Sequence, residues 1–231
     1  MMMRIVWLAT FAAILVMAGF SLYGASAIPE DAMIARHWNL AGEADGFSPR
    51  NHVLVAMPAL ALLIAIVFAL VPMIDPRKRN VAASRGLLFT SWLGAMTLLA
   101  VAHGWIVLTA ARGETAGAPP PHVILYTVSA LLVAIGNFVA KSRSNFFLGV
   151  RTPWTLSSEY AWSVANRAGG YMLVLTGVAA AAAAAGYLID LRTGMLTLVA
   201  GALATAVVSI AVSYFAWRSD PERGGPESDA A

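Results

Sequence analysis

Six long apolar runs, separated by shorter polar segments, organise the chain. Each run has roughly 20 residues, and a helix of that length crosses the ~30 Å hydrocarbon core of a bilayer. The runs occupy residues 5–25, 53–74, 86–110, 122–140, 169–189 and 195–217. The pattern therefore predicts an all-α fold, a polytopic membrane helical bundle of about six transmembrane helices.

The first run has a second interpretation, as a secretory signal peptide. Arg4 precedes it, and Ala25-Ser26-Ala27 has the A-x-A form of a cleavage site. The run is longer than the apolar core of a usual signal peptide. We therefore expect it to be retained as a transmembrane helix, with cleavage as the alternative.

The first long polar segment, residues 28–52, is too short for a domain of its own. Gly42 and Gly46 predict a tight turn over residues 39–46, because glycine accepts positive φ angles. Its imidazoles and carboxylates are of the types that bind zinc, but their spacing is irregular. We favour a structured loop in which His37 and Asn39 bond backbone groups, and expect no metal or cofactor.

The second long polar segment follows the fourth run and contains Thr152-Pro153. A residue before proline is driven out of the helical region, so we expect the helix to break at residues 151–153. Ser157 is the predicted cap of a short interfacial helix, with Glu159 in its first turn, where a carboxylate suits the helix dipole.

Arg151, Trp154 and Trp162 in this segment are typical of side chains that anchor a bundle at the membrane–water interface. The alternative is a two-pronged bond from Arg151 to a carboxylate, for which Glu159 is the nearest candidate; lysine cannot replace arginine in such a bond.

Composition supports an integral membrane protein. Hydrophobic residues make up 59% of the chain, charged residues 12%, and the mean hydropathy is +0.73. The absence of cysteine excludes disulfides and thiolate metal sites. The net charge of +3 includes no basic cluster that indicates nucleic-acid binding.

The distribution of lysine and arginine predicts the orientation. Eleven of these residues fall on the side that carries both termini and residues 141–168, and four fall on the other side. Cytoplasmic loops are the richer in Lys and Arg. We therefore expect both termini and residues 141–168 in the cytoplasm of a bacterial inner membrane, and residues 28–52 outside.

Two polar residues fall inside or near the end of predicted spans, His103 in the third and Asn137 in the fourth. With Arg151 they are the candidate site of a transporter or membrane enzyme. For His103 we favour a hydrogen bond between helices. Neither an acidic pair for proton relay nor a nucleophile with a base is evident, so we expect no enzyme activity.

Two motifs resemble a known family. Residues 136–162, which include Asn137, Asn145 and the run L-G-V-R-T-P-W-T-L-S at 148–157, resemble the signature of the SdpI family of bacterial membrane proteins. Residues 37–45, H-W-N-x-x-G-x-x-D, resemble the motif of a small domain of unknown function that often forms the N-terminal half of these proteins.

The resemblance implies two membrane halves, residues 1–110 and 111–217, and a tail, residues 218–231, that we expect to be disordered. It implies immunity to a secreted antibacterial toxin, signalling by holding a cytoplasmic repressor at the membrane, or both. The expected partners are therefore the lipid bilayer, an extracellular toxin or peptide, and a repressor protein. The candidate partner-binding residues are His37, Trp38, Asn39, Gly42, Asp45, Asn137, Asn145, Gly149, Arg151, Thr152, Pro153, Trp154 and Glu159.

Overall fold

The computed structural model describes residues 2–39, 43–114, 122–185 and 191–224. Within them, six helices are long and apolar enough to cross a membrane, which confirms a polytopic helical bundle. These are α1 (Met2–Ala27), α2 (Arg50–Ile74), α4 (Arg85–Ala111), α5 (His122–Val139), α7 (Glu159–Ala185) and α8 (Leu191–Arg218). Each begins and ends within about ten residues of the apolar run that predicts it.

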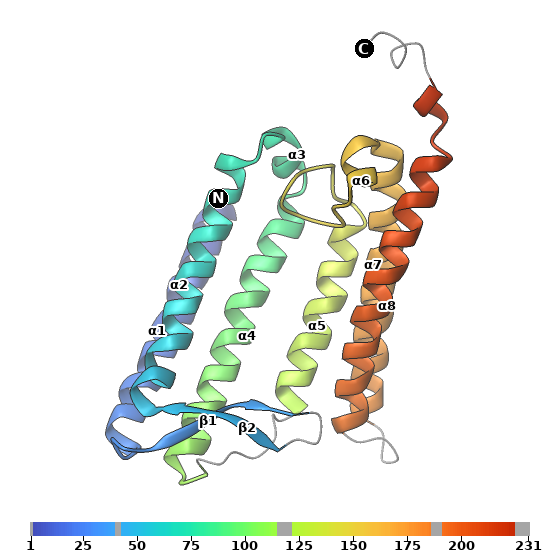
Figure 1. Ribbon diagram of the computed structural model, residues 1–231. Helices are drawn as coiled ribbons and strands as arrows, with labels where there is room; N and C mark the ends of the chain where they lie inside the picture. Colours follow the sequence, from blue (N-terminus) through green and yellow to red (C-terminus); the bar gives the residue numbers. More distant parts are fainter. Residues whose placement is uncertain (1, 40–42, 115–121, 186–190, 225–231) are drawn as a thin grey trace.

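The helices form two groups that stand side by side: α1, α2 and α4, then α5, α7 and α8 (Figure 1). Helix α4 packs against α5 and joins the groups. Within the second group α5 and α7 approach closely. The approach is close enough that a Cβ on Gly136 would lie 2.5 Å from the carbonyl oxygen of Gly170. Small residues allow such contact between membrane helices.

Residues 33–38 and 44–49 are the paired strands of a β-hairpin, an element that the sequence pattern did not predict. Strand β1 (Met33–Trp38) pairs antiparallel with β2 (Ala44–Pro49), and Trp38 lies opposite Ala44. Residues 44–46, expected in a turn, belong to β2, and residues 40–42 lie outside the described chain. Buried Arg50 donates to the carbonyl oxygen of Ile28 (2.7 Å), so the base of the hairpin is tied to the end of α1.

At the opposite end of the bundle, helix α3 (Lys78–Ala83) and the polar loop 140–152 lie next to helix α6 (Pro153–Ser157) (Figure 1). The predicted break at 151–153 is present, but the predicted cap was wrong. Thr152 caps α6, and Ser157 lies at the end of that helix. Ser158 is extended (φ −144°, ψ 120°), and α7 then runs unbroken from Glu159 through the fifth span.

The ends of α8 differ slightly from the sixth apolar run. The helix begins at Leu191, before that run starts at residue 195, and residues 186–190 lie outside the described chain. Arg218 ends α8, and Pro221–Gly224 form the 3₁₀ helix η1. Residues 115–121 of the proline-containing connection and residues 225–231 are likewise not described.

Candidate functional site

Asn145 organises the polar loop 140–152. Its side chain is fully buried. Its Oδ1 accepts from the backbone N–H groups of Phe147 (3.0 Å) and Leu148 (2.7 Å). Its Nδ2 donates to the carbonyl oxygens of Arg143 (2.8 Å) and Leu148 (3.1 Å). One side chain thus pairs backbone groups that would otherwise lack a partner. A buried backbone group without a partner would destabilise the fold by about 1–3 kcal/mol.

Gly149 fixes the contact between this loop and α7. Its φ angle is +104°, and a Cβ there would lie 2.4 Å from Oδ1 of Asn166. The same oxygen accepts from the N–H of Val150 (2.7 Å), and Asn166 is buried. Both the φ angle and the close approach therefore require glycine.

Thr152 and Pro153 start helix α6 as a capping box. The Thr152 hydroxyl accepts from the N–H of Thr155 (3.2 Å), and the Thr155 hydroxyl accepts from the N–H of Thr152 (2.9 Å). Proline at the first helical position needs no N–H partner. Thr152 also donates to the hydroxyl of Ser213 in α8 (3.0 Å), so the loop is attached to the last span.

The start of α7 is joined to the segment after α8. Ser158 Oγ accepts from the N–H of Ala161 (2.9 Å) and donates to Oδ2 of Asp220 (2.5 Å). The pKa of Asp220 is lowered, first by this hydroxyl and then by the N–H of Glu222. Ser158 is thus a cap for α7 and a partner for the chain that leaves the bundle.

Two tryptophans expected at the membrane interface have different positions. Trp154 is half-buried, with its ring edge-on to Tyr214 at 5.2 Å between centroids. Trp162 is fully buried, and its Nε1–H donates to the carbonyl oxygen of Ser142 (3.0 Å). An indole buried in this way is part of the core, so the interface assignment for Trp162 was wrong.

Asp75 connects the two helix groups, and the sequence analysis gave it no role. It follows α2 and is fully buried. Its Oδ2 accepts from the N–H of Phe146 (2.9 Å), and its Oδ1 accepts from the N–H of Arg77 (2.7 Å). The carboxylate thus holds the polar loop on the end of the first helix group.

Three neighbours of Asp75 complete this connection, and we call Asp75, Arg77, Asn80 and Ser84 the inter-half clasp. Arg77 Nη2 donates to the carbonyl oxygen of Leu156 (2.9 Å), and Nη1 donates to Ser144. Its guanidinium lies 5.2 Å from the centroid of the Phe146 ring. Asn80 donates to the carbonyl oxygen of Ser144 (2.7 Å), and Ser84 Oγ accepts from the N–H of Arg143 (2.9 Å). In the sequence, this segment contributed only to the distribution of lysine and arginine that predicts the orientation.

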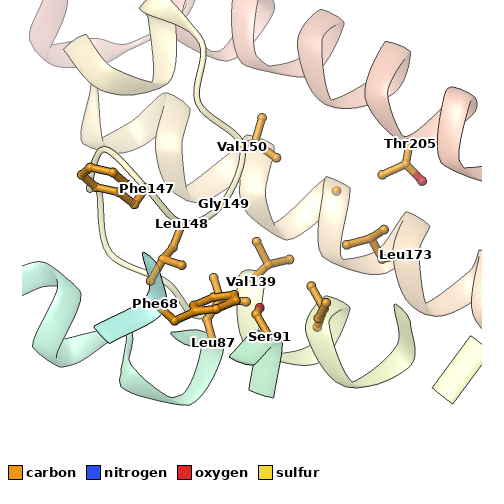
Figure 2. Close-up of a pocket in the computed structure, with 12 residues that line it drawn as sticks. Phe68, Leu87, Ser91, Val139, Phe147, Leu148, Gly149, Val150, Leu173 and Thr205 are labelled. Atoms are coloured by element: carbon orange, nitrogen blue, oxygen red, sulfur yellow. The ribbon is translucent and has the colours of Figure 1, made fainter. Parts of the chain in front are cut away.

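A cavity of about 350 Å³ lies below the polar loop, between the two helix groups (Figure 2). Phe147, Leu148, Gly149 and Val150 of the loop line one side. The other lining residues come from α2, α4, α5, α7 and α8, and their polar groups are the hydroxyls of Ser91 and Thr205. Residues of the polar loop therefore form one wall of an apolar cavity. No local motif could indicate this cavity, because its other walls come from five separate helices.

The alternative considered for Arg151, a bond to Glu159, is not formed. Arg151 is exposed and donates from Nη1 to the carbonyl oxygen of Phe146 (3.0 Å). Glu159 is exposed in the first turn of α7. Asn137 is also exposed, and its Oδ1 accepts from Lys141 Nζ (3.0 Å), one helical turn along the chain. Arg151 thus meets a backbone carbonyl, because the loop bends back on itself around Asn145.

The hairpin motif lies at the other end of the bundle. His37 Nδ1 is 2.5 Å from Oδ1 of Asp45, and both side chains are largely exposed. Asn39 Nδ2 donates to Glu43 (3.0 Å). Trp38 is half-buried and packs on Trp105 of α4 at 5.3 Å between ring centroids. Gly42 lies outside the described residues, and within them no three His, Asp or Glu side chains gather as a metal site would require.

His103 joins helices in the first group. It is fully buried, and Nε2 lies 3.0 Å from Ser21 Oγ, which donates to the carbonyl oxygen of Leu54 (2.6 Å). That carbonyl lacks its usual helical donor, because the residue four positions on is Pro58. The Ser21 hydroxyl also lies 3.0 Å from the carbonyl oxygen of Met17, so Ser21 and His103 join α1, α2 and α4.

The structure does not bring His103, Asn137 and Arg151 together as one transport or enzyme site. His103 lies in the part of α4 near the hairpin, whereas Asn137 lies in the last turn of α5, at the loop end (Figure 1). The candidate motif residues likewise form two sets, one at each end of the bundle.

Comparison with known proteins gives two separate matches along the chain. Residues 141–213 match the SdpI/YfhL protein family, and residues 10–62 match a domain of unknown function, DUF1648. Over 50 residues the chain is 38% identical to Immunity protein SdpI of Bacillus subtilis (strain 168), which is 22% of this chain and 24% of that protein. No solved structure matches the chain. Over residues 141–213, this multi-pass membrane protein is similar to the SdpI/YfhL protein family.

Proposed function

We propose that this chain is an immunity protein of the bacterial cytoplasmic membrane, which protects its host from a secreted antibacterial toxin. The observation that carries the proposal is the similarity to Immunity protein SdpI together with the family match. The aligned stretch is about a quarter of that relative. The activity of the whole relative is therefore part of the proposal.

The hairpin is the element that we assign to toxin contact. It stands at the end of the bundle that is poor in lysine and arginine, and we assign this end to the outside because cytoplasmic loops are the richer in these residues. Its exposed side chains include His37, Asp45 and Phe47, the last 43% exposed. Trp38 and Ile34 instead face the helices and hold the hairpin in place. A fixed scaffold with an exposed edge is suited to binding a peptide.

The polar loop at the opposite end supports a second function, retention of a cytoplasmic repressor. Arg151 and Phe146 are exposed next to one another, and Phe146 is 43% exposed. Exposed aromatic and arginine side chains are the types enriched in protein–protein interfaces.

Survival of a sensitive strain tests the immunity proposal. The chain, with an epitope tag, is expressed in Bacillus subtilis 168 that lacks Immunity protein SdpI, and survival is measured against the toxin to which that protein gives immunity. We expect protection at a membrane abundance equal to that of the relative. Sensitivity at equal abundance would contradict the proposal.

A matched pair of variants assigns the toxin contact to one end. Phe47 and Phe146 have the same exposed fraction, 43%, but lie at opposite ends of the bundle. We expect Phe47→Ser to lower protection at least tenfold, and Phe146→Ser to leave it unchanged. Loss of protection in the second variant alone would move toxin contact to the polar loop.

A further inference from the structure

The cavity below the polar loop lies at the depth of lipid chains. Phe68 precedes the end of α2 by six residues, and Ser91 follows the start of α4 by six. At 1.5 Å per residue, both lie about 9 Å from the helix ends. The cavity is therefore inside the membrane-spanning part of the bundle, in the leaflet next to the polar loop.

The lining selects a hydrocarbon ligand. Its side chains are apolar except for two hydroxyls, and the twelve lining residues, all described, include no charged group. A volume of about 350 Å³ is at the small end of ligand pockets, and a helix 10–12 Å wide does not fit in it. Water does not fill an apolar cavity of this kind. An apolar ligand that fills it lowers the free energy, because apolar surface is buried.

The arrangement of the helices gives this ligand an entry from the bilayer. Helix packing runs from α2 to α4, α5, α7 and α8, and α2 and α8 stand at the two ends of the row (Figure 1). Both ends line the cavity, through Phe68 and Thr205. Because α2 and α8 are not neighbours in this row, the side between them, below the polar loop, is where a lipid chain would enter.

Arg151 supplies an exposed cationic group next in sequence to the cavity lining. It follows Val150, which lines the cavity, and it donates to the carbonyl oxygen of Phe146, next to the lining residue Phe147. The guanidinium is exposed, so its remaining N–H groups are accessible to a headgroup. Arginine forms two parallel bonds to a phosphate more readily than lysine does.

We propose that this cavity holds one hydrocarbon chain of an anionic phospholipid whose phosphate is bound by Arg151. The loop that carries the family motif would then be a lipid-binding element, with its conformation set by Asn145 and the inter-half clasp. The proposal goes beyond toxin immunity and does not depend on it.

Native mass spectrometry of the purified full chain tests the proposal. The protein is exchanged into detergent with phosphatidylglycerol or phosphatidylcholine of the same chains. We expect one retained phosphatidylglycerol per chain, at least tenfold less in Ser91→Phe, which fills the cavity, and no change in Thr197→Phe, which adds the same ring to α8 outside the lining. Arg151→Ala should reduce the preference for phosphatidylglycerol at least threefold, and Arg151→Lys should restore it only in part.

A photo-crosslinking phosphatidylglycerol, with a diazirine in its acyl chain, provides a measurement on the unmodified chain. Adducts on α4 and α7 at the cavity residues are expected. Three results would each overturn the proposal. The first is equal lipid retention in wild type and Ser91→Phe, and the second is adducts confined to the lipid-facing sides of α1 and α8. The third is crosslinking at the cavity residues that an added peptide blocks and added lipid does not.

Discussion

Asp75 is a buried carboxylate with both oxygens occupied, and its replacement by asparagine gives a residue-scale prediction. In Asp75→Asn, an NH₂ group faces the N–H of Phe146 or of Arg77, so one buried donor loses its acceptor. We expect a loss of about 1–3 kcal/mol in the free energy of unfolding. Denaturant titration in detergent measures this loss.

The control for this prediction is Asp31→Asn, the same change at an exposed position. It should alter the free energy of unfolding by less than about 0.5 kcal/mol. Equal stability of the two variants would show that the Asp75 bonds contribute nothing to the fold.

At the residue scale, local chemistry predicted part of the site. It placed Thr152 and Pro153 at a helix break, and the structure confirms the break. It did not find the roles of Asp75 and Asn166, because their partners lie 71 and 16 residues away. Such pairings depend on how helices from both groups pack, which no spacing within one segment encodes.

At the scale of elements, the junction of α6, α7 and the segment after α8 gives a pH-dependent prediction. Ser158→Ala removes the hydroxyl that bonds Asp220, so the pKa of Asp220 should rise toward its ordinary value. In the wild type the pKa is lowered, so the bond is present at neutral pH and is lost as the pH falls through the folded-state pKa. Carbon NMR of the aspartate carboxyl groups in detergent follows this titration.

Ser157→Ala is the matched control, because among the described residues the Ser157 hydroxyl donates to the carbonyl oxygens of Pro153 and Trp154 and not to Asp220. It should leave the pKa of Asp220 unchanged. An unshifted titration in Ser158→Ala would mean that the hydroxyl does not set this pKa.

Long elements were predictable and short ones were not. Six spans follow from the length and hydropathy of their runs, since a bilayer requires about 20 apolar residues. The hairpin was missed because M-I-A-R-H-W and A-D-G-F-S-P alternate only weakly, and Ile34 and Ala35 are both buried. The cap was misassigned because Ser157 and Ser158 are equally suitable by type, and only the extended backbone at Ser158 decides between them.

At the scale of the molecule, the inter-half clasp and the helix contact between α4 and α5 unite two parts that match different families. Residues 75–84 lie outside both matched regions. The clasp therefore joins the DUF1648 and SdpI parts through a connecting segment, and a change in it should affect the polar loop rather than the hairpin.

The orientation of the whole bundle is the remaining prediction, and the absence of cysteine makes it testable by labelling. Asp31 is exposed beside the hairpin, whereas Ala83 and Ser157 are exposed at the loop end. Since lysine and arginine concentrate at the loop end, we expect Asp31→Cys to react with an impermeant maleimide in intact cells. Ala83→Cys and Ser157→Cys should react only after the cells are broken, and the unmodified chain should not react at all. Reaction of the two loop-end variants in intact cells, with Asp31→Cys protected, would invert the bundle and place the hairpin in the cytoplasm, where it cannot meet a secreted toxin.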